Sequence, residues 1–398
     1  RSDRGRISVH AGGAGLSEKN RGGTCMQKAK VYYTSLRVPV GVSRLDKLER
    51  LIRAAGLGDI DFNRKMTAIK IHFGEPGNLT YLRPNYAKRV ADVVKSLGGI
   101  PFLTDCNTLY PGRRKNAIEH MDSAYENGFS PFSTGCHVII GDGLKGSDDV
   151  EVPVAGGEYV KTAKIGRAIM DADVFISLSH FKGHEATGFG GAIKNIGMGC
   201  GSRRGKMEQH ASGKPQADPA LCVGCRQCAK QCAQDAFSYE GGKAHIDHNR
   251  CVGCGRCIAA CAFDAISTDD DSAAELLNCK MAEYAKAVVD GRPGFHINLV
   301  LEISPYCDCH PENDVAILPD VGMFASFDPV ALDRACVDAC LKQNPMPGSL
   351  LDDRMHEAGF RDHHDHFKNT TPASEWRSCL DHAEKIGLGT QSYELVTV

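Results

Sequence analysis

The chain has 398 residues and a nearly balanced charge, with 47 lysines and arginines against 49 aspartates and glutamates. This balance gives no electrostatic basis for binding nucleic acid or an anionic membrane surface. No apolar run approaches the roughly 18 residues that a transmembrane helix needs. The length is enough for one large hydrophobic core and a second, smaller domain.

The first 25 residues are rich in Gly, Arg and Ser and contain no apolar segment. We therefore expect residues 1–25 to be a disordered or non-native leader rather than a secretory signal. Met26 is the expected start of the protein, because a strand-like pattern begins shortly after it.

From residue 30 to about 200, apolar runs of strand length alternate with helical patterns. Ser43 is the expected cap of a helix to Ala55, and Pro84 suits the first turn of a helix to Leu97. The other predicted helices cover 113–126 and 159–170, and the predicted strands cover 30–38, 67–73, 100–103, 138–140 and 174–178. This alternation predicts an α/β fold with a mainly parallel sheet flanked by helices.

The alternation stops near residue 200, where the polar, turn-rich segment 201–218 has the composition of a linker. It resumes with a helix over 273–289, a strand over 296–303, apolar stretches at 315–318 and 322–324, a helix from Asp328, a helix over 375–386 and an edge strand over 393–398. The sequence thus predicts one α/β domain in two parts, 26–214 and 271–398, interrupted by an insert at 215–270.

Two cysteine runs dominate the predicted insert, and each has the spacing C-x2-C-x2-C-x3-C. Three closely spaced thiolates converge on one metal centre, whereas the fourth cysteine points to a second centre. The runs therefore predict a ferredoxin-like α+β domain with two [4Fe–4S] clusters. One cluster would be held by Cys222, Cys225, Cys228 and Cys261, and the other by Cys251, Cys254, Cys257 and Cys232.

Zinc sites and a disulfide framework are the alternative interpretations of these cysteines. Structural zinc normally uses pairs of C-x2-C, and disulfide frameworks are typical of small secreted domains. The insert resembles a bacterial-type two-cluster ferredoxin, although Ala233 and Ala262 replace the proline that usually follows the fourth cysteine. The ten remaining cysteines, read mostly as small buried residues, favour a reducing cytoplasm with little oxygen.

Polar residues follow several predicted strands, where ligands bind in open parallel sheets. We expect Lys70, His72, Lys182 and His184 to form a positively charged cleft that holds or protonates an anionic substrate. The neighbouring candidates are Asp105, Cys106, Asn107, Ser179, His180, Gly188, Gly190, Gly191, Lys194 and Asn195. The alternative is that each of these residues only caps a strand at the surface. The glycines match neither a dinucleotide fingerprint nor a P-loop.

A second candidate site is Cys307-Asp308-Cys309-His310, just beyond a predicted strand. Two thiols and an imidazole could bind a further soft metal, with Cys200 as an additional ligand. Reduced structural thiols in a turn are the alternative. The run from His363 to His366 is expected to be a solvated surface rather than a metal site.

With these motifs in view, residues 27–398 resemble the iron–sulfur centre proteins of the DUF362 family. The resemblance rests on segments 70–74, 104–108, 179–184, 190–200, 307–309 and 328–333. It implies an α/β fold with a ferredoxin-type insert, but the family has no settled reaction.

The leading functional hypothesis is a cytoplasmic redox protein of an anaerobic or facultatively anaerobic cell. Its two clusters would relay electrons between a partner protein and the cleft. If the protein is an enzyme, it would be an oxidoreductase that uses iron–sulfur clusters. The competing hypothesis is a non-catalytic electron carrier or assembly factor, in which the α/β domain serves for docking. A purely structural role for the clusters ranks lowest, because two linked clusters exceed what stability requires.

Overall fold

An eight-stranded sheet forms the centre of the larger part of the chain. The computed structural model describes residues 28–109, 112–210, 214–232, 234–251, 257, 261, 263, 265–267 and 272–398. The predicted leader, 1–25, lies outside the described residues. We call 28–210 together with 272–398 the body, and 215–270 the insert.

The strands of the large sheet follow the order β16-β1-β15-β14-β7-β2-β3-β4. Five of the seven neighbouring pairs are parallel, and β15 is antiparallel to both of its neighbours. The bounds are β1 (Ala29–Thr34), β2 (Met66–Lys70), β3 (Ile100–Asp105), β4 (His137–Ile140), β7 (Val174–His180), β14 (Gly294–Val300), β15 (Gly322–Ser326) and β16 (Tyr393–Thr397). The predicted α/β class with a mainly parallel sheet is confirmed.

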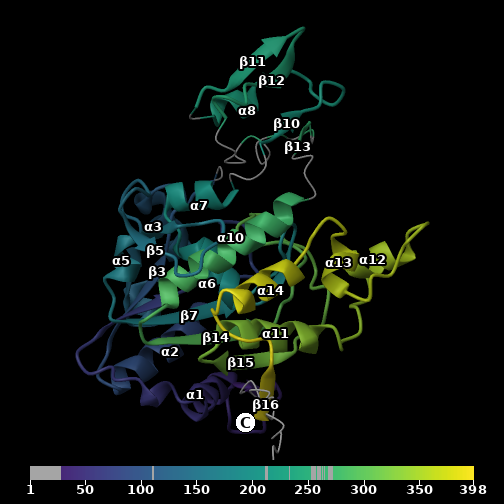
Figure 1. The fold of residues 1–398 in the computed structure, drawn as a ribbon. Helices are drawn as coiled ribbons and strands as arrows, with labels where there is room; N and C mark the ends of the chain where they lie inside the picture. The colour runs from purple at the N-terminus through teal and green to yellow at the C-terminus, as the bar shows by residue number, and fades with distance from the viewer. Residues whose placement is uncertain are drawn as a thin grey trace, which may run out of the picture.

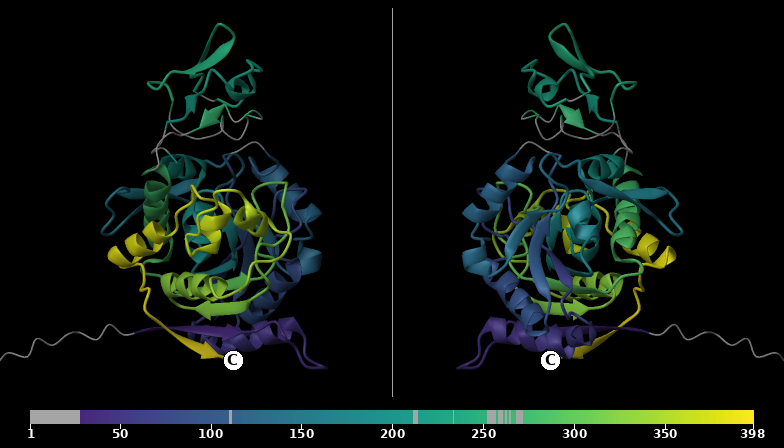
Figure 2. Two further views of the ribbon diagram at one scale, coloured as in Figure 1. Left: turned by 90° about the vertical axis from the view of Figure 1, so that its right-hand side faces the viewer. Right: turned by 90° about the vertical axis from the view of Figure 1, so that its left-hand side faces the viewer.

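Helices cover both faces of this sheet (Figures 1 and 2). One face packs against α6 (Ala192–Cys200), α10 (Ser272–Val289), α11 (Pro329–Cys340) and α14 (Arg377–Lys385), and the other against α1 (Arg44–Ala54), α2 (Pro84–Ser96) and α3 (Ala117–Glu126). Residues of β7 alternate between the two layers, with Phe175 in the first and Val174, Ile176 and Leu178 in the second. This alternation is what a strand buried on both faces requires.

Local sequence signals located several elements correctly. Ser43 caps α1 in a capping box with Asp46, and Pro84 and Pro329 open α2 and α11. The last segment is an edge strand, as predicted, and it pairs in parallel with β1. These elements are specified by caps and prolines that act within one turn of chain.

Two local predictions were wrong. The helix expected over 159–170 is mostly a strand, β6 (Thr162–Gly166), which pairs with β5 (Asp149–Pro153) before the short helix α5 (Arg167–Met170). The linker expected over 201–218 contains the helix α7 (Arg203–His210). Both segments are determined by tertiary contacts: Ala163 and Ile165 belong to the core layer beneath α10, and Gly205 is buried against Tyr284.

Shorter elements connect these layers. They are η1 (Leu57–Asp59), α4 (Pro131–Thr134), the hairpin β8 (Lys182–His184) with β9 (Gly188–Gly190), α12 (Leu350–His356) and α13 (His366–Thr370). The apolar stretch at 315–318 makes only an isolated bridge between Ile303 and Leu318. Among the described residues, no helix combines the length and the apolar composition that a membrane crossing needs.

The insert projects from one end of the body (Figure 1). Its described elements are β10 (Gln216–Ala217), α8 (Gln227–Lys230), β11 (Phe237–Glu240), β12 (Lys243–Ile246) and β13 (Ile266–Ser267). It has a small hydrophobic core of its own, which includes Cys222, Cys228, Cys257, Ala244 and Ile266.

Candidate functional site

Four cysteines of the insert line one cavity. Cys222, Cys225 and Cys228 come from the first cysteine run, and Cys261 comes from the second. The cavity has an empty volume of about 330 Å³, part of it open to solvent, and its walls include Tyr239, Arg226 and the apolar residues Val223, Ala244, Phe263, Ala265 and Ile266. The four cysteines are the set that the sequence assigns to the first cluster, so the donor set and its largely apolar surroundings fit a [4Fe–4S] centre.

Backbone N–H groups donate to one sulfur of each predicted ligand set. The Ala244 N–H donates to Cys222 Sγ at 3.4 Å, and the Ala236 N–H donates to Cys232 Sγ at 3.4 Å. Such backbone donors lower the pKa of the Cys222 thiol and favour its thiolate form. Hydrogen bonds of this kind also tune the potential of a bound cluster.

The second predicted ligand set is described only in part. Cys257 is buried, and Cys232 and Cys251 are partly buried, whereas Cys254 lies outside the described residues. The cysteines of the described residues form no disulfide with one another. The second cluster therefore stays a prediction from spacing.

The carboxyl ends of β2, β3 and β7 meet at one edge of the large sheet, as the parallel pairing requires. Lys70 ends β2, and its Nζ lies 3.0 Å from Asp105 Oδ1 at the end of β3. The same Nζ donates to Asn195 Oδ1 of α6 at 2.7 Å. Although burial opposes ionisation, Lys70 holds the pKa of Asp105 well below its usual range. Lys70 is therefore a buried, ion-paired cation.

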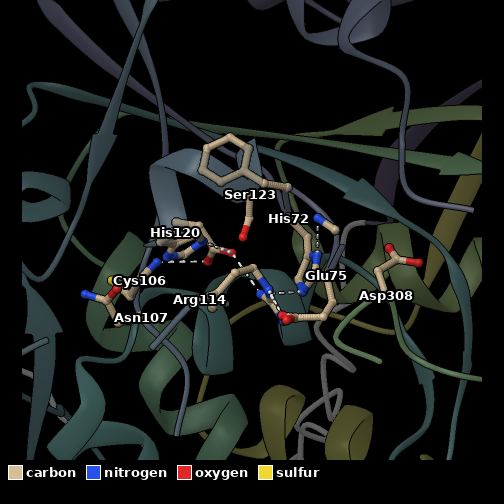
Figure 3. Close-up of polar contacts among 12 residues, drawn as sticks. His72, Glu75, Cys106, Asn107, Arg114, His120, Ser123 and Asp308 are labelled. Atoms are coloured by element: carbon tan, nitrogen blue, oxygen red, sulfur yellow. Dashed lines mark hydrogen bonds and ion pairs between the residues drawn. The ribbon is translucent and has the colours of Figure 1, made fainter. Parts of the chain in front are cut away.

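His72 lies beside a second buried ion pair (Figure 3). Arg114 Nε donates to Glu75 Oε2 at 2.8 Å, and Arg114 NH1 lies 3.0 Å from His72 Nε2. The other ring nitrogen of His72 accepts the Gly74 N–H at 3.0 Å. Burial, together with the Arg114 guanidinium, lowers the pKa of His72 well below its ordinary value. The imidazole is therefore neutral near pH 7 and is a poor proton donor.

A third pair joins β7 to the loop after β14. His180 Nδ1 lies 2.9 Å from Asp308 Oδ2, and its Nε2 lies 2.8 Å from the Leu301 carbonyl. Lys182 Nζ is 3.9 Å from the same Asp308 oxygen. Asp308 thus balances the charge of the hairpin that carries Lys182.

Cys307 and Cys309 form a hydrogen-bonded thiol pair in this loop. Lys194 Nζ lies 3.2 Å from Cys307 Sγ. The hydrogen bond from Cys309, with Lys182 and Lys194 nearby, lowers the pKa of Cys307, whereas the same bond raises the pKa of Cys309. Cys307 is therefore the more acidic thiol of the pair.

The four predicted catalytic residues are thus brought to one edge of the sheet, but in a different electrostatic setting from the one expected. The sequence predicted a positively charged cleft, whereas buried carboxylates lie beside Lys70 and Lys182. His184 is also buried, and burial lowers its pKa. The region is a charge-balanced network, which we call the strand-end network. Its members are Lys70, His72, Glu75, Asp105, Arg114, His180, Lys182, His184, Lys194, Asn195, Cys307, Asp308 and Cys309.

Sequence reasoning missed Glu75 and Arg114 of this network. Glu75 lies in the Gly-Glu-Pro-Gly turn after β2, and Arg114 was assigned to a helix. The helix α3 begins later, because Asn116 caps it by accepting the Glu119 N–H. Recognising that cap would have placed Arg114 in the loop at the strand ends.

Other predicted site residues lie elsewhere. Cys200 is buried at the end of α6, where its carbonyl accepts the thiol of Cys106 at 3.4 Å, and the structure does not group it with Cys307. In the histidine run, Asp365 caps α13 and accepts Trp376 Nε1, whereas His364 is exposed. That run is part of the C-terminal packing of the body.

Comparison with known proteins supports the family resemblance. The model of the family described as "Domain of unknown function (DUF362)" matches residues 67–338. No curated protein matches the chain significantly.

Two solved structures show distant similarity. The lactate racemase apoprotein from Thermoanaerobacterium thermosaccharolyticum has 12% identity and a TM-score of 0.31, with 69% of this chain and 51% of that chain covered. A protein from Thermotoga maritima has 13% identity and a TM-score of 0.35, with 75% and 57% covered. The chain therefore spans little more than half the length of either protein.

Proposed function

Because the chain belongs to the DUF362 family, whose function is unknown, we propose a function from its own residues: an iron–sulfur redox protein. The observation that carries this proposal is the cavity of the insert. Cysteines from two separate runs, Cys222, Cys225, Cys228 and Cys261, line it together in the combination that crossed cluster ligation requires. Bound [4Fe–4S] clusters supply one-electron transfer.

Within this proposal, groups of the body can transfer protons and bind an anion while the clusters transfer electrons. Lys182 is buried and Lys194 is partly buried, both cations lie near Cys307, and burial lowers the pKa of the His184 imidazole beside them. A small anionic substrate would bind here by displacing one of the internal carboxylate partners, such as Asp308. This is the oxidoreductase form of the proposal.

Metal analysis of the anaerobically purified chain tests the cluster proposal. We expect about eight iron and eight sulfide per chain for two [4Fe–4S] centres. Cys222→Ser should remove about half of the iron, whereas Cys340→Ala, a buried cysteine of α11, should leave the iron content unchanged. A protein that contains zinc and no iron would contradict the proposal.

A second candidate, a non-catalytic electron carrier, is favoured by the surface around the insert cavity. Leu221, Val223 and Phe263 are about half exposed there, and Cys225 is exposed. The ion-paired network in the body is consistent with this role, because its cations already have internal partners. An apolar rim beside a redox centre suits transient docking of a partner protein.

Anaerobic co-purification separates the two candidates. For a carrier, Leu221→Asp, beside the cavity but outside its lining, should release the bound partner protein at unchanged iron content, whereas Val315→Asp, at an exposed site in the body, should not. For an oxidoreductase, Lys182→Met should abolish substrate-dependent oxidation of the reduced protein. If Lys182→Met and the parent protein respond alike to every metabolite that co-purifies, the oxidoreductase form fails.

A further inference from the structure

We propose that Glu185, Cys309 and His310 bind a single divalent metal ion, with zinc as the best fit. This site is separate from the cysteines of the insert and does not depend on the iron–sulfur proposal. Its ligands come from two segments of the body: the turn of the β8–β9 hairpin and the loop that follows β14.

The geometry of the three donor groups supports this site. One ligand atom from each residue lies within 4.8 Å of the others. His310 Nε2 lies 3.0 Å from Glu185 Oε1, so the imidazole and the carboxylate already face each other. A thiolate, an imidazole and a carboxylate that converge in this way can enclose one ion with small side-chain movements.

The carboxylate of Glu185 is incompletely satisfied in the described structure. Its Oε1 contacts His310 and lies 3.4 Å from His184 Nε2. Its Oε2 is buried and has no hydrogen-bond partner among the described residues. A buried carboxylate oxygen without a partner costs free energy, and a metal ion would provide the missing partner.

Neighbouring backbone contacts hold the two segments in place. The Gly183 N–H donates to the Ser304 carbonyl at 2.8 Å, and a Cβ at Gly183 would lie 2.6 Å from the Pro305 carbonyl oxygen. Asn78 Nδ2 donates to the His310 carbonyl at 3.1 Å. Both ligand-bearing segments are therefore held by backbone contacts that leave the ligand atoms free, which is the arrangement expected of a preorganised site.

His184 acts as a positioning residue rather than a ligand. Its Nδ1 accepts the N–H groups of Ala186 and Thr187, both at 3.1 Å, so the ring proton is on Nε2. That nitrogen faces Glu185 and Cys307. A proton donor directed at a ligating carboxylate orients it, as is common around metal sites.

The chemistry of the donor set identifies the class of metal. Thiolate and imidazole ligands favour zinc and other borderline ions over magnesium and calcium, which prefer oxygen. Two negative ligands, Glu185 and Cys309, would neutralise the charge of a divalent ion in a region that already contains Lys194. Three protein ligands leave a fourth position open, the arrangement found in catalytic zinc sites.

Zinc binding to the intact, iron-loaded chain tests the proposal. After treatment with a chelator, the protein is titrated with Zn²⁺ against a chromophoric competitor, and its iron content is measured in parallel. We expect one zinc per chain in addition to the iron. Glu185→Gln, Cys309→Ala and His310→Ala should each weaken binding at least as much as the loss of an outer-shell partner does, roughly 10–100-fold.

Two matched variants control for zinc that binds at surface histidines or at the cysteines of the insert. His364→Ala removes an exposed histidine beside Asp362 and should leave zinc affinity unchanged. Cys222→Ser alters the insert and should lower the iron content while zinc binding is retained. The circular dichroism spectrum of Glu185→Gln, which keeps the size of the side chain, checks that the variant is folded.

X-ray absorption at the zinc edge gives an independent result. We expect one sulfur at about 2.3 Å, with the remaining ligands nitrogen or oxygen at about 2.0–2.2 Å. A shell of four sulfurs would place the zinc in the insert cysteines and overturn the proposal. Equal zinc affinity in Glu185→Gln and the parent chain would overturn it as well, whatever the iron content.

Discussion

At the scale of single residues, the site is built from buried charges that have partners inside the protein. Lys70 is 1% exposed, and Asp105, its partner, is 3% exposed. Such a pair stabilises the fold only while both partners are present, because the loss of one leaves a buried charge without compensation.

Removing the cation of this pair should therefore be costly. We expect Lys70→Met to lower the free energy of unfolding by about 3 kcal/mol, because the buried Asp105 would lose its nearest cation and keep only Arg114 NH1, at 3.8 Å. Denaturant unfolding followed through the fluorescence of Trp376, the single tryptophan of the chain, measures the change.

The control for Lys70→Met is an exposed pair of similar type. Lys88 and Asp92 form an i,i+4 pair on α2 at 2.9 Å, and both side chains are more than 40% exposed. Lys88→Met should cost less than about 1 kcal/mol. If the two variants lose the same free energy of unfolding, the buried pair stabilises the fold no more than the exposed pair does.

A second residue-scale prediction concerns pH. His382 Nε2 lies 2.9 Å from Glu283 Oε1; although burial opposes it, hydrogen bonds to Cys279 and Glu283 raise the pKa of His382 to about 9. A group whose pKa is raised in the folded state contributes stability that is fully present below its unfolded pKa of about 6.5 and is lost as pH rises through 9.

The thermal midpoint at pH 6.5 and pH 9.5 checks this window. The parent chain should lose stability between the two values, and His382→Gln should lose less, because it has no proton to release. His356→Gln, at an exposed histidine of α12, serves as the control and should follow the parent. If the thermal midpoint of His382→Gln falls with pH as much as that of the parent chain, His382 is not the group responsible.

At the scale of elements, glycines decide how closely α6 approaches its neighbours. A Cβ at Gly197 would lie 2.1 Å from the Met281 carbonyl oxygen of α10, and one at Gly199 would lie 2.5 Å from Lys70 Nζ. The helix is therefore pressed against α10 on one side and against the strand-end network on the other. This close approach is what allows Asn195 of α6 to reach Lys70.

Gly197→Ala should force these helices apart. We expect a loss of about 3 kcal/mol, because backbone rather than a flexible side chain opposes the added methyl group. Gly58→Ala in η1 is the control, since a methyl group added there would meet nothing within 4 Å, and it should change stability by less than about 1 kcal/mol. The same unfolding measurement compares the two, and equal stabilities would refute the packing argument.

At the scale of the whole molecule, the insert and the body have separate cores. The apolar residues of the insert pack among themselves, whereas the two body layers lie on either side of the large sheet. Figure 2 shows the insert beyond the helices that cover the body. Among the residues of the insert that the structure describes, no strand belongs to the large sheet, so the continuity of the sheet does not require them.

Replacing residues 215–270 with a flexible Gly/Ser linker should therefore leave the body folded. We expect cooperative unfolding, reported by Trp376, close to that of the parent chain, together with the loss of the iron. Limited proteolysis provides a second check, since a folded body resists digestion. An unfolded product would show that the body depends on the insert.

Much of this protein was predictable from short-range patterns. The cysteine spacing predicted two ligand sets, and the four cysteines of one set line one cavity of the structure. The alternation of strands and helices predicted the sheet and placed Lys70 and Asp105 at its carboxyl edge. These features depend on patterns that are local in the sequence or that repeat along it, and for that reason a single sequence reveals them.

The rest was decided by contacts between distant segments. The sequence pattern favoured a helix at 159–170, but packing beneath α10 makes a strand there. The positions of lysines and histidines after the predicted strands identified the cations of the cleft. Only the tertiary structure paired Arg114 with Glu75 and brought Glu185 to Cys309 and His310. Residue types and local periodicity determined the elements and the cysteine sets, but charge balance and metal geometry depend on distances between segments up to 125 residues apart.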